Sequence, residues 1–582
     1  MCGLAGIFDL KGRAPIAEAA IRAMTDAIVH RGPDGEGFHL DPGVALGHRR
    51  LAIIDPEGGK QPMYNEDGTI AVVFVGEIYN FQDLVTELVS LGHIFRTRCD
   101  TEVIVHAWEQ WGEDAVTRFR GMFTFALWDS RRETLFIARD RLGKKPLYYT
   151  VLKDGRCFFA SELKSILVHP EVPREIDPRA VEDYLAFGYV PDPRTIYRGI
   201  HKLPPAHTLT LVRGDKEAMP SQYWDVRFEA VPPVSEAAAA EELIEQLRQA
   251  VTMRLVSDVP LGAFLSGGVD SSAIVSLMAD ASTEPVRTFS IAFKQKEFDE
   301  SAYAERIARQ YHTRHHVREV DADAFDLVDR LALVYDEPFA DSSAIPTFQV
   351  CAAAREGVTV ALSGDGGDEI FAGYRRYLWH SSTERVRGLL PDGLRQSLFG
   401  FLGRVYPKLD WAPRALRAKH TFQELANDTL GGYFISVATI QDELRQRLIS
   451  AELRQRLGDY HAIEVLARHG AMAEVDDPLS WAQYIDLKTW LAGRMLVKVD
   501  RAAMANSLEV RVPLLDHCFV EWAARLPASL KLGGTEGKRI FKKALEGRVP
   551  NDILYRPKQG FSVPLSKWFR GPLKQRLRDA LL

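Results

Sequence analysis

One short loop constrains what this chain can fold into more than any other feature. It reads SGGVDSS at residues 266–272, follows an apolar run at 259–265, and precedes a helical pattern that we expect to begin at about Ser271. Glycines let the backbone approach an anion closely, and the N-terminus of a helix attracts phosphate. Asp270 and a phosphate are both negatively charged, so Asp270 suits a phosphate site only if a cation lies between the carboxylate and the phosphate. We therefore interpret Asp270 as a magnesium ligand. The alternative, a plain strand-to-helix turn of small residues, explains the serines and Asp270 less well.

A second loop of similar kind supports this interpretation. Residues 358–362 form another strand-like run, which leads into SGDGGDE at residues 363–369. Together with a third run at 288–293 and helical segments between, the pattern predicts a parallel doubly wound sheet, where ligands bind beyond the carboxyl ends of the strands. Asp270 and Asp368 would then share one magnesium ion. A solvated acidic turn is the alternative for the second loop, and it is the weaker one beside the first. Beyond about residue 380 the chain is expected to be largely helical.

The N-terminal part has a different pattern. A β-branched run at 70–75 suits a strand buried on both faces, and short strands with a few helices predict an α+β domain. Around 229–242 a Pro-Pro pair is followed by small and acidic residues, which indicates a linker and a helix start with Ser235 as its N-cap. We therefore predict a first domain at 1–215, a linker at 216–240 and a second domain at 241–582.

Bulk properties exclude several classes of protein. A chain of 582 residues is too long for one ordinary core, and a net charge of -6 with a pI of about 6.3 gives no reason to expect nucleic acid or an anionic membrane as a partner. No apolar run has the length of a membrane span, and the N-terminus lacks the basic region of a signal peptide. Five scattered cysteines, without the spacing of a zinc site, favour a reducing cytoplasm.

Cys2 is a candidate nucleophile. If Met1 is removed, Cys2 becomes the N-terminal residue, so that one residue carries both the thiolate that attacks and the amine that manages the proton. That amine titrates at about 7.7 to 8.0 in model compounds, close to neutral pH. A cysteine at position 2 has no meaning by itself, and the segments that follow it decide its interpretation.

Those segments resemble the class II glutamine amidotransferase domains, the N-terminal-nucleophile type, over about residues 2–210. The shared segments, in the order of the family, are CGLAGIFD, HRGPDGEG, GHRRLAIID, VGEIYNF, CDTEVI, RDRLGKKPLYY and ASELKSIL. The resemblance implies that Cys2 is the nucleophile and that Arg50 grips the carboxylate of glutamine through its bidentate guanidinium. It also implies that Glu77 and Asp100 hold the glutamine amine. Further contacts are expected from the backbone of Leu51, Ile53, Ile54 and Gly76.

One position departs from the family. The family has Asn-Gly-Glu where this chain has Val75-Gly76-Glu77, and the Asn side chain with the Gly N–H forms the oxyanion hole. Val75 cannot donate a hydrogen bond. The loss of one oxyanion donor costs on the order of 10²–10³ in rate, so we expect slow glutamine hydrolysis unless another donor substitutes.

The whole chain resembles glutamine-hydrolysing asparagine synthetase. The SGGVDSS loop is similar to the pyrophosphate loop of enzymes that form acyl-adenylates, and it lacks the Gly-Lys-Ser/Thr ending of a Walker A loop. Segments at 497–517, 537–545 and 556–569 agree with the same family. The resemblance implies Asp270 and Asp368 as magnesium ligands, Asp365 beside the acyl-adenylate, and Lys538 at the pyrophosphate, with Lys542 and Lys543 as alternatives. The implied ATP contacts are Phe264, Ser266, Gly267, Gly268, Ser271, Ser272, Ile291, Ser363 and Gly364.

The expected activity is therefore the ATP- and glutamine-dependent amidation of aspartate to asparagine through a β-aspartyl-adenylate. Because the two sites lie on different domains, ammonia would travel through an internal passage. The acceptor segment DEPFADSSAIPT at 336–347 differs from that of short asparagine synthetases. The N-terminal sequence also resembles amidotransferases of bacterial exopolysaccharide systems, which implies a sugar acid as the second candidate acceptor. A weakly catalytic ATP-binding regulatory relative is a third interpretation. A homodimer is an expectation from the family alone.

Overall fold

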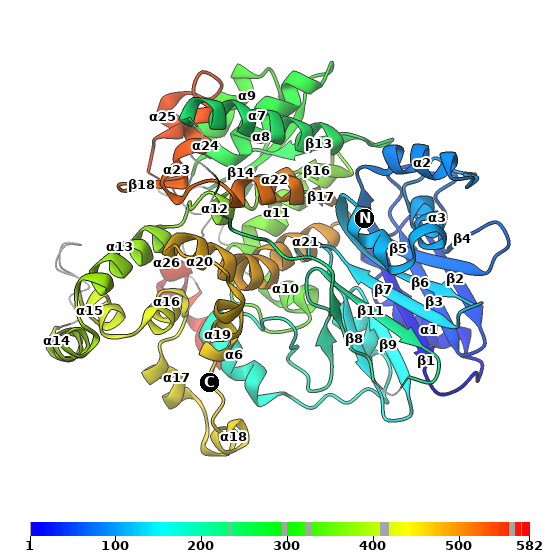
Figure 1. Ribbon diagram of the computed structural model, residues 1–582, viewed down its shortest axis with the longest axis horizontal. Helices are drawn as coiled ribbons and strands as arrows, with labels where there is room; N and C mark the ends of the chain where they lie inside the picture. Colours follow the sequence, from blue (N-terminus) through cyan, green and yellow to red (C-terminus); the bar gives the residue numbers. More distant parts are fainter. Residues whose placement is uncertain are drawn as a thin grey trace.

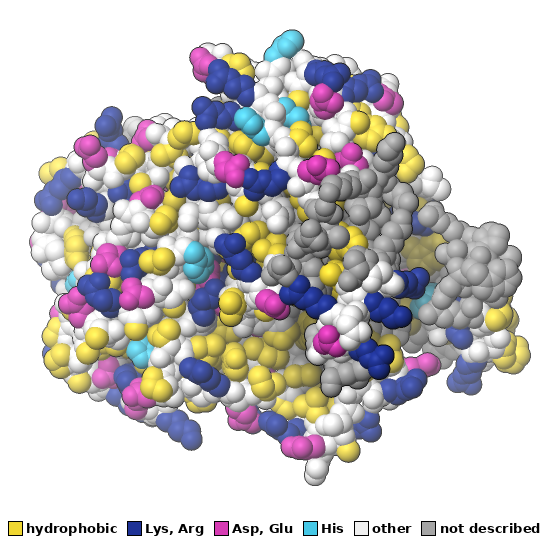
Figure 2. Space-filling model, turned by 180° about the vertical axis from the view of Figure 1, so that it is seen from behind, with side chains coloured by type: hydrophobic (Ala, Val, Ile, Leu, Met, Phe, Trp, Pro, Cys, Tyr) yellow, Lys and Arg dark blue, Asp and Glu magenta, His cyan; other side chains and the backbone are white. Residues whose placement is uncertain are grey.

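The computed structural model describes residues 2–215, 217–229, 231, 235–293, 299–320, 327–407, 418–557, 565–571 and 573–581. Parts of the predicted linker and of the 556–569 segment therefore lie outside the described residues. Two antiparallel sheets at the N-terminal end adjoin a parallel sheet, and a mainly helical region completes the molecule (Figure 1). None of the helices in the described ranges is long and apolar enough to cross a bilayer. Seen from behind, basic and acidic side chains of the described residues are interspersed over the surface (Figure 2).

The N-terminal part is a sandwich of two six-stranded antiparallel sheets. The strands of the first sheet, in spatial order, are β10 (His201–Lys202), β8 (Tyr148–Val151), β9 (Arg156–Ala160), β1 (Gly3–Asp9), β3 (Val44–Arg50) and β2 (Gly35–Asp41). Those of the second sheet are β12 (Ser221–Gln222), β11 (His207–Val212), β7 (Thr134–Arg139), β6 (Gly121–Asp129), β5 (Ile70–Ile78) and β4 (Met63–Tyr64). Apolar side chains from both sheets form the core between them. The predicted α+β domain is confirmed in this form.

Strand β5 explains how the sandwich is filled. The predicted strand at 70–75 is confirmed and extends to Ile78. Because side chains alternate along a strand, Val72 and Phe74 pack against the cluster that includes helices α2 (Phe81–Ser90) and α3 (Thr101–Trp111). Val73 and Val75 face the other way, into the core between the sheets.

The second part is built around a five-stranded parallel sheet. Its order is β15 (Arg314–Val320), β14 (Arg287–Phe293), β13 (Leu261–Phe264), β16 (Val360–Leu362) and β17 (Glu509–Arg511). The chain runs outward from β13 through β14 in one direction and through β16 in the other. The switch point of this topology therefore lies between β13 and β16, where ligands bind in such folds. The three predicted strands and the parallel sheet are confirmed, and β15 and β17 are additions to them.

Helices cover both faces of this sheet, with α8 (Val269–Ala281) and α9 (Ser301–Gln310) on one side and α11 (Ala344–Arg355) and α21 (Leu496–Met504) on the other (Figure 1). Helix α8 begins two residues earlier than expected because the extended Gly268 already serves as its N-cap. The predicted cap of α7 (Glu236–Met253) is confirmed, since the Ser235 side chain accepts a hydrogen bond from the N–H of Ala238. From α13 (Arg375–Leu389) to α27 (Lys574–Leu581) the described chain is largely helical, as expected.

Candidate active sites

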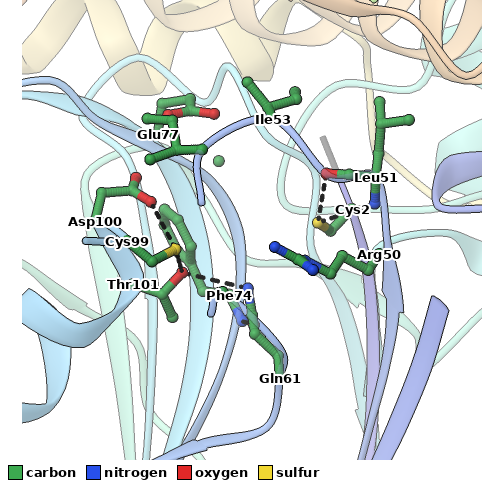
Figure 3. A pocket seen from close by; sticks show the side chains of 13 residues that line it. Cys2, Arg50, Leu51, Ile53, Gln61, Phe74, Glu77, Cys99, Asp100 and Thr101 are labelled. Carbon is green, nitrogen blue, oxygen red and sulfur yellow. Dashed lines mark hydrogen bonds between the residues drawn. The ribbon is translucent and has the colours of Figure 1, made fainter. Parts of the chain in front are cut away.

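The first site is a pocket at the edge of the sandwich, where β1, β3 and β5 come together. Figure 3 shows Cys2 and Arg50 on one side of it and Glu77, Asp100 and Thr101 on the other. The predicted residues that line it are Cys2, Arg50, Leu51, Ile53, Ile54, Gly76, Glu77 and Asp100. The sequence interpretation missed its remaining members, which are Gly59, Gln61, Phe74, Cys99 and Thr101. Cys99 and Thr101 belong to the segment CDTEVI that the chain shares with the family, so the sequence could have indicated both.

Cys2 is buried and held from two sides. Its Sγ accepts a hydrogen bond from the N–H of Leu51 at 3.4 Å, and its own carbonyl accepts one from Arg31 Nε at 3.1 Å. Burial raises the pKa of the Cys2 thiol, which favours the neutral form. The residue is therefore fixed in position, and its activation as a nucleophile requires a base.

The other end of the pocket is acidic. Asp100 accepts a hydrogen bond from the N–H of Ile78 at 2.9 Å, and Glu77 lies 3.3 Å from Arg511. Burial raises the pKa of Asp100 to about 6, and burial together with neighbouring carboxylates raises that of Glu77. A bound ammonium group would reverse both effects, because an opposite charge nearby favours the carboxylate form. Arg50 lies between these acids and Cys2, with its guanidinium held by the carbonyl of Asp55 at 2.7 Å (Figure 3).

Gly76 and Val75 differ in what they offer the pocket. Gly76 has φ of +148°, and a Cβ there would lie 2.0 Å from the carbonyl oxygen of Met122, so only glycine fits. The Val75 side chain is fully buried in the core between the sheets, in the same apolar cluster as Cys2. Val75, which stands at the position of the family's oxyanion Asn and was expected at the glutamine site, does not line the pocket.

The second site lies at the switch point of the parallel sheet. The loops that follow β13 and β16 are in direct contact, because a Cβ on Gly364 would lie 2.8 Å from the backbone N of Ser271. Gly267 has φ of +70° and closely approaches the backbone of Ala304. The Ser271 side chain ties the first loop together, since its Oγ accepts a hydrogen bond from the N–H of Ser266 at 3.2 Å. The sequence thus folds two glycine-rich turns against each other.

Lys538 joins the two loops. Its Nζ lies 2.5 Å from Asp270 and 2.7 Å from Asp368, so both carboxylates converge on one cation. The two acids outweigh burial and raise the pKa of Lys538. Lys542 and Lys543 do not share this place, because they pair with Glu536 and Glu546. Of the three lysines that the sequence offers, Lys538 is the one at the paired aspartates.

The remaining predicted residues lie at or near these loops. The Ser363 hydroxyl donates a hydrogen bond to the carboxylate of Asp365. Phe264 is the last residue of β13, whereas Ile291 lies in the neighbouring strand β14 and packs into the apolar core. Beside Asp368, burial raises the pKa of Glu369 to about 7, and Glu369 accepts a hydrogen bond from the Tyr374 hydroxyl at 2.7 Å. This last pair was missed by the sequence interpretation.

Comparisons with known proteins show which family the chain belongs to. A family model described as glutamine amidotransferase domain matches residues 1–224, and one described as asparagine synthase matches residues 242–582. "Asparagine synthetase (glutamine-hydrolyzing) 1" of Bacillus subtilis (strain 168) is 34% identical, with 100% of this chain and 90% of the relative covered. The chain belongs to the asparagine synthetase family. A second B. subtilis member, numbered 3, is 33% identical over 96% of this chain and 87% of its own length. "Amidase chyE" of Penicillium rubens is 28% identical, covering 100% of this chain and 91% of its own.

The two matched regions are called here the amidotransferase domain (1–224) and the synthetase domain (242–582). Buried ion pairs join them, and sequence reasoning missed these pairs. Arg31 pairs with Glu162 and with Asp500 of α21, each at 2.9 Å, and Arg501 pairs with Glu162 at 2.8 Å. Lys145 lies 3.6 Å from Asp500. Since Arg31 also holds the carbonyl of Cys2, this network connects the first site to the synthetase domain.

The segment expected to bind the acceptor takes part in the same interface. Asp336 pairs with Lys164 at 3.1 Å and with Arg501 at 3.4 Å, and Glu337 pairs with Lys202. Both acids are buried, with side-chain exposures of 3% and 8%. Both carboxylates therefore form ion pairs with basic residues of the amidotransferase and synthetase domains.

Proposed function

We propose that this chain catalyses the ATP- and glutamine-dependent amidation of a carboxylate, with aspartate as acceptor and asparagine, AMP, pyrophosphate and glutamate as products. The observation that carries the proposal is the convergence of Asp270, Asp368 and Lys538 at the switch point of the parallel sheet. Family membership and the pocket around Cys2 support the use of glutamine as nitrogen donor. The enzyme class is accordingly a carbon–nitrogen ligase.

In the first reaction, the Cys2 thiolate attacks the side-chain amide of glutamine. Once Met1 is removed, the α-amine of Cys2 takes the thiol proton and passes it to the departing ammonia. Arg50 binds the glutamine carboxylate and the acids Glu77 and Asp100 bind its ammonium group. The N–H of Gly76 faces the developing oxyanion as one donor, while Val75 supplies none. Water then releases glutamate and restores the thiol.

In the second reaction, the acceptor carboxylate attacks the α-phosphorus of ATP and pyrophosphate leaves. The glycine-rich loop at 266–272 receives phosphate oxygens on backbone N–H groups at the start of α8. Asp270 and Asp368 would hold the magnesium ion, for which two converging carboxylates are a suitable oxygen ligand set, and a bound ion would neutralise phosphate charge. Lys538 stabilises the departing pyrophosphate, and Asp365 is placed beside the acyl-adenylate that ammonia attacks.

Ammonia formed at Cys2 has to reach the acyl-adenylate in the other domain. The buried interface around Arg31, Asp500 and Arg501 supports a route that is closed to bulk water. We propose that ammonia travels through this interface. A competition with ¹⁵N-labelled ammonium during turnover on unlabelled glutamine tests it: product that carries mostly ¹⁴N is expected, and product nitrogen that follows the bulk pool would contradict the passage.

The acceptor is the part of the proposal that has a specific alternative. Asp336 and Glu337 are engaged at the domain interface, and a relative named as an amidase matches the whole chain. Both observations favour another carboxylate as the second candidate, and the sugar acid is the one that the resemblance to exopolysaccharide systems implies. The third interpretation, a weakly catalytic regulatory relative, is opposed by the intact acids and lysine at the second site.

Pyrophosphate release from ATP and magnesium tests the function, with asparagine assayed as product. Aspartate-dependent release with both glutamine and ammonium is expected, and Cys2→Ala should abolish only the glutamine-dependent part. Asparagine from ammonium alone would place a defect at Val75. No aspartate-dependent release would refute aspartate as acceptor, and release with a sugar acid would support the second candidate.

A further inference from the structure

A group of metal-ligating side chains lies at the outer edge of the amidotransferase domain, away from both proposed sites. Helix α3 carries His106 and Glu109 one turn apart, and His93 lies in the connection between α2 and α3. Figure 1 shows α2 and α3 side by side at this edge. His106 is 2% exposed at its side chain, and His93 and Glu109 are 15% and 23% exposed. The group is thus accessible from solvent on one side only.

Three atoms of this group converge. The Nδ1 atoms of His93 and His106 lie 3.4 Å and 3.0 Å from the same oxygen, Oε2 of Glu109. Glu66 is the next group, with its Oε1 at 4.0 Å from His106 Nδ1. Ligands about 2.0 to 2.2 Å from a tetrahedral zinc ion are separated from each other by roughly 3.3 Å, which is close to these distances.

Two of the three ligands are supported on their far side. Gln110 Oε1 lies 3.2 Å from Nε2 of His93, whereas Nε2 of His106 is 3.7 Å from Glu102 Oε1 and has no hydrogen-bond partner among the described residues. The amide of Asn65 donates a hydrogen bond to the other oxygen of Glu109 at 2.9 Å. Acceptors on the outer nitrogens of histidines and donors on the ligating carboxylate are the usual outer support of a metal site.

Without a metal, His106 itself holds Glu109, since its Nδ1 lies 3.0 Å from Oε2 of that carboxylate. The neighbouring acids outweigh burial and raise the pKa of His106 to about 9, so a proton lies between the two groups near neutral pH. A divalent ion at this point would replace that proton and would bind His93 as well.

Two other groups of the described residues have similar ligand types, and both already contain a cation. Arg445 donates a hydrogen bond to Glu182 and Asp442, beside His461. Asp516, next to His517 and Cys518, pairs with Arg120 and Arg254. The group around His106 differs in its partners: among the described residues, Glu109 and Glu66 pair with histidines and with no Lys or Arg.

We propose that His93 Nδ1, His106 Nδ1 and Glu109 Oε2 bind one divalent transition-metal ion, with water as the fourth ligand. Two imidazoles and one carboxylate suit zinc, which accepts nitrogen and oxygen ligands in tetrahedral sites. The ion would tie the α2–α3 connection to α3. Since Asp100 and Thr101 at the start of α3 belong to the glutamine pocket, the site stabilises the helix that carries them.

Zinc binding to the metal-stripped full-length protein in excess magnesium tests the proposal. Wild type is expected to keep one zinc per chain after desalting, and cobalt should give the visible absorption of a tetrahedral site. Zinc should also raise the melting temperature. His93→Ala and the isosteric Glu109→Gln should each weaken zinc affinity by at least about tenfold and remove the thermal shift, as losses of ligands or their support do.

Two matched variants serve as controls. His39→Ala removes a histidine of the same domain outside the group, and Cys2→Ala removes the thiol of the glutamine pocket; both should bind zinc as wild type does. Wild type without zinc, or His93→Ala with unchanged affinity, would overturn the proposal and leave an ion-pair cluster. Loss of zinc in Cys2→Ala would overturn it by placing the ion in the glutamine pocket.

Discussion

Replacement of Val75 by Asn provides the sharpest test of the oxyanion interpretation. Val75 is fully buried in the core between the sheets, in one cluster with Cys2, and the next residue, Gly76, lines the glutamine pocket. In the register of β5 and β6 it lies opposite Thr124, whose buried Oγ1 has no hydrogen-bond partner among the described residues. An amide at position 75 would therefore have one protein partner before any substrate binds.

The substitution should raise the rate of glutamine hydrolysis and lower the stability of the fold. A restored oxyanion donor should raise kcat for glutamine hydrolysis by about 10²-fold to 10³-fold. Loss of a fully buried Val side chain costs about 1.5–3 kcal/mol of stability, and a hydrogen bond to Thr124 returns about 0.5–1.5 kcal/mol. We therefore expect Val75→Asn to hydrolyse glutamine faster while its free energy of unfolding falls by about 1–2 kcal/mol.

Val73→Asn is the matched control. Val73 lies on the same face of β5, is equally buried and belongs to the same cluster, but it is not next to Gly76. It should lose stability without any gain in glutaminase rate. Glutamate release is measured at saturating glutamine, and unfolding is measured in urea. A Val75→Asn variant that folds and shows no gain over wild type would refute the reasoning, as would an equal gain in Val73→Asn.

Three further predictions concern charged groups. Lys538→Met should lower pyrophosphate release by about 10²-fold and leave glutamine hydrolysis unchanged, and an unchanged release rate would remove Lys538 from the adenylation site. Asp500→Asn removes one charged partner of the buried Arg31 and should lower the free energy of unfolding in urea by about 3 kcal/mol. The control Asp154→Asn removes an exposed ion pair and should lower it by less than about 0.5 kcal/mol. Equal losses in the two variants would contradict the importance of burial. Burial raises the pKa of Asp100 from 3.8 to about 6, so ionisation of this carboxyl group should lower the free energy of unfolding as pH rises through that window. Over the same window kcat/KM for glutamine should rise, because the carboxylate that binds the glutamine amine is forming. A kcat/KM that does not change between pH 3.8 and about 6 would refute the role of Asp100 in glutamine binding.

Much of the fold could be predicted because its strands are apolar and locally bounded. The runs that became β5, β13, β14 and β16 contain β-branched or aromatic residues, and β13 and β16 lead into glycine-rich turns. Strand β15 was missed because it is an edge strand with the polar sequence RHHVREV. Strand β17 was missed because it has three residues, two of them charged, and becomes a strand only through pairing with β16. Its charges are paired inside the protein, which no local hydrophobic pattern indicates.

The candidate sites divide in the same way. Asp270 and Asp368 could be placed together from sequence, since each follows a predicted parallel strand. The position of Lys538 could not, because it depends on a left-handed backbone at that residue and on contact with loops more than 150 residues away. Arg31 and Asp500 are 469 residues apart, and their pairing exists only in the assembled domains. Local patterns therefore identify the chemistry of each site better than they identify what connects the two.

That connection has a physical consequence for the proposed transfer of ammonia. Buried ion pairs contribute little net stability compared with apolar packing of similar volume, but a pair that is broken or displaced leaves a buried charge that costs several kcal/mol. An apolar interface can slide, whereas the network of Arg31, Glu162, Asp500 and Arg501 tolerates few alternative positions. Because Arg31 also holds the carbonyl of Cys2, displacement of α21 would disturb the nucleophile itself. We infer that the interface is charged because orientation between the two sites, more than adhesion between the domains, is what the reaction requires.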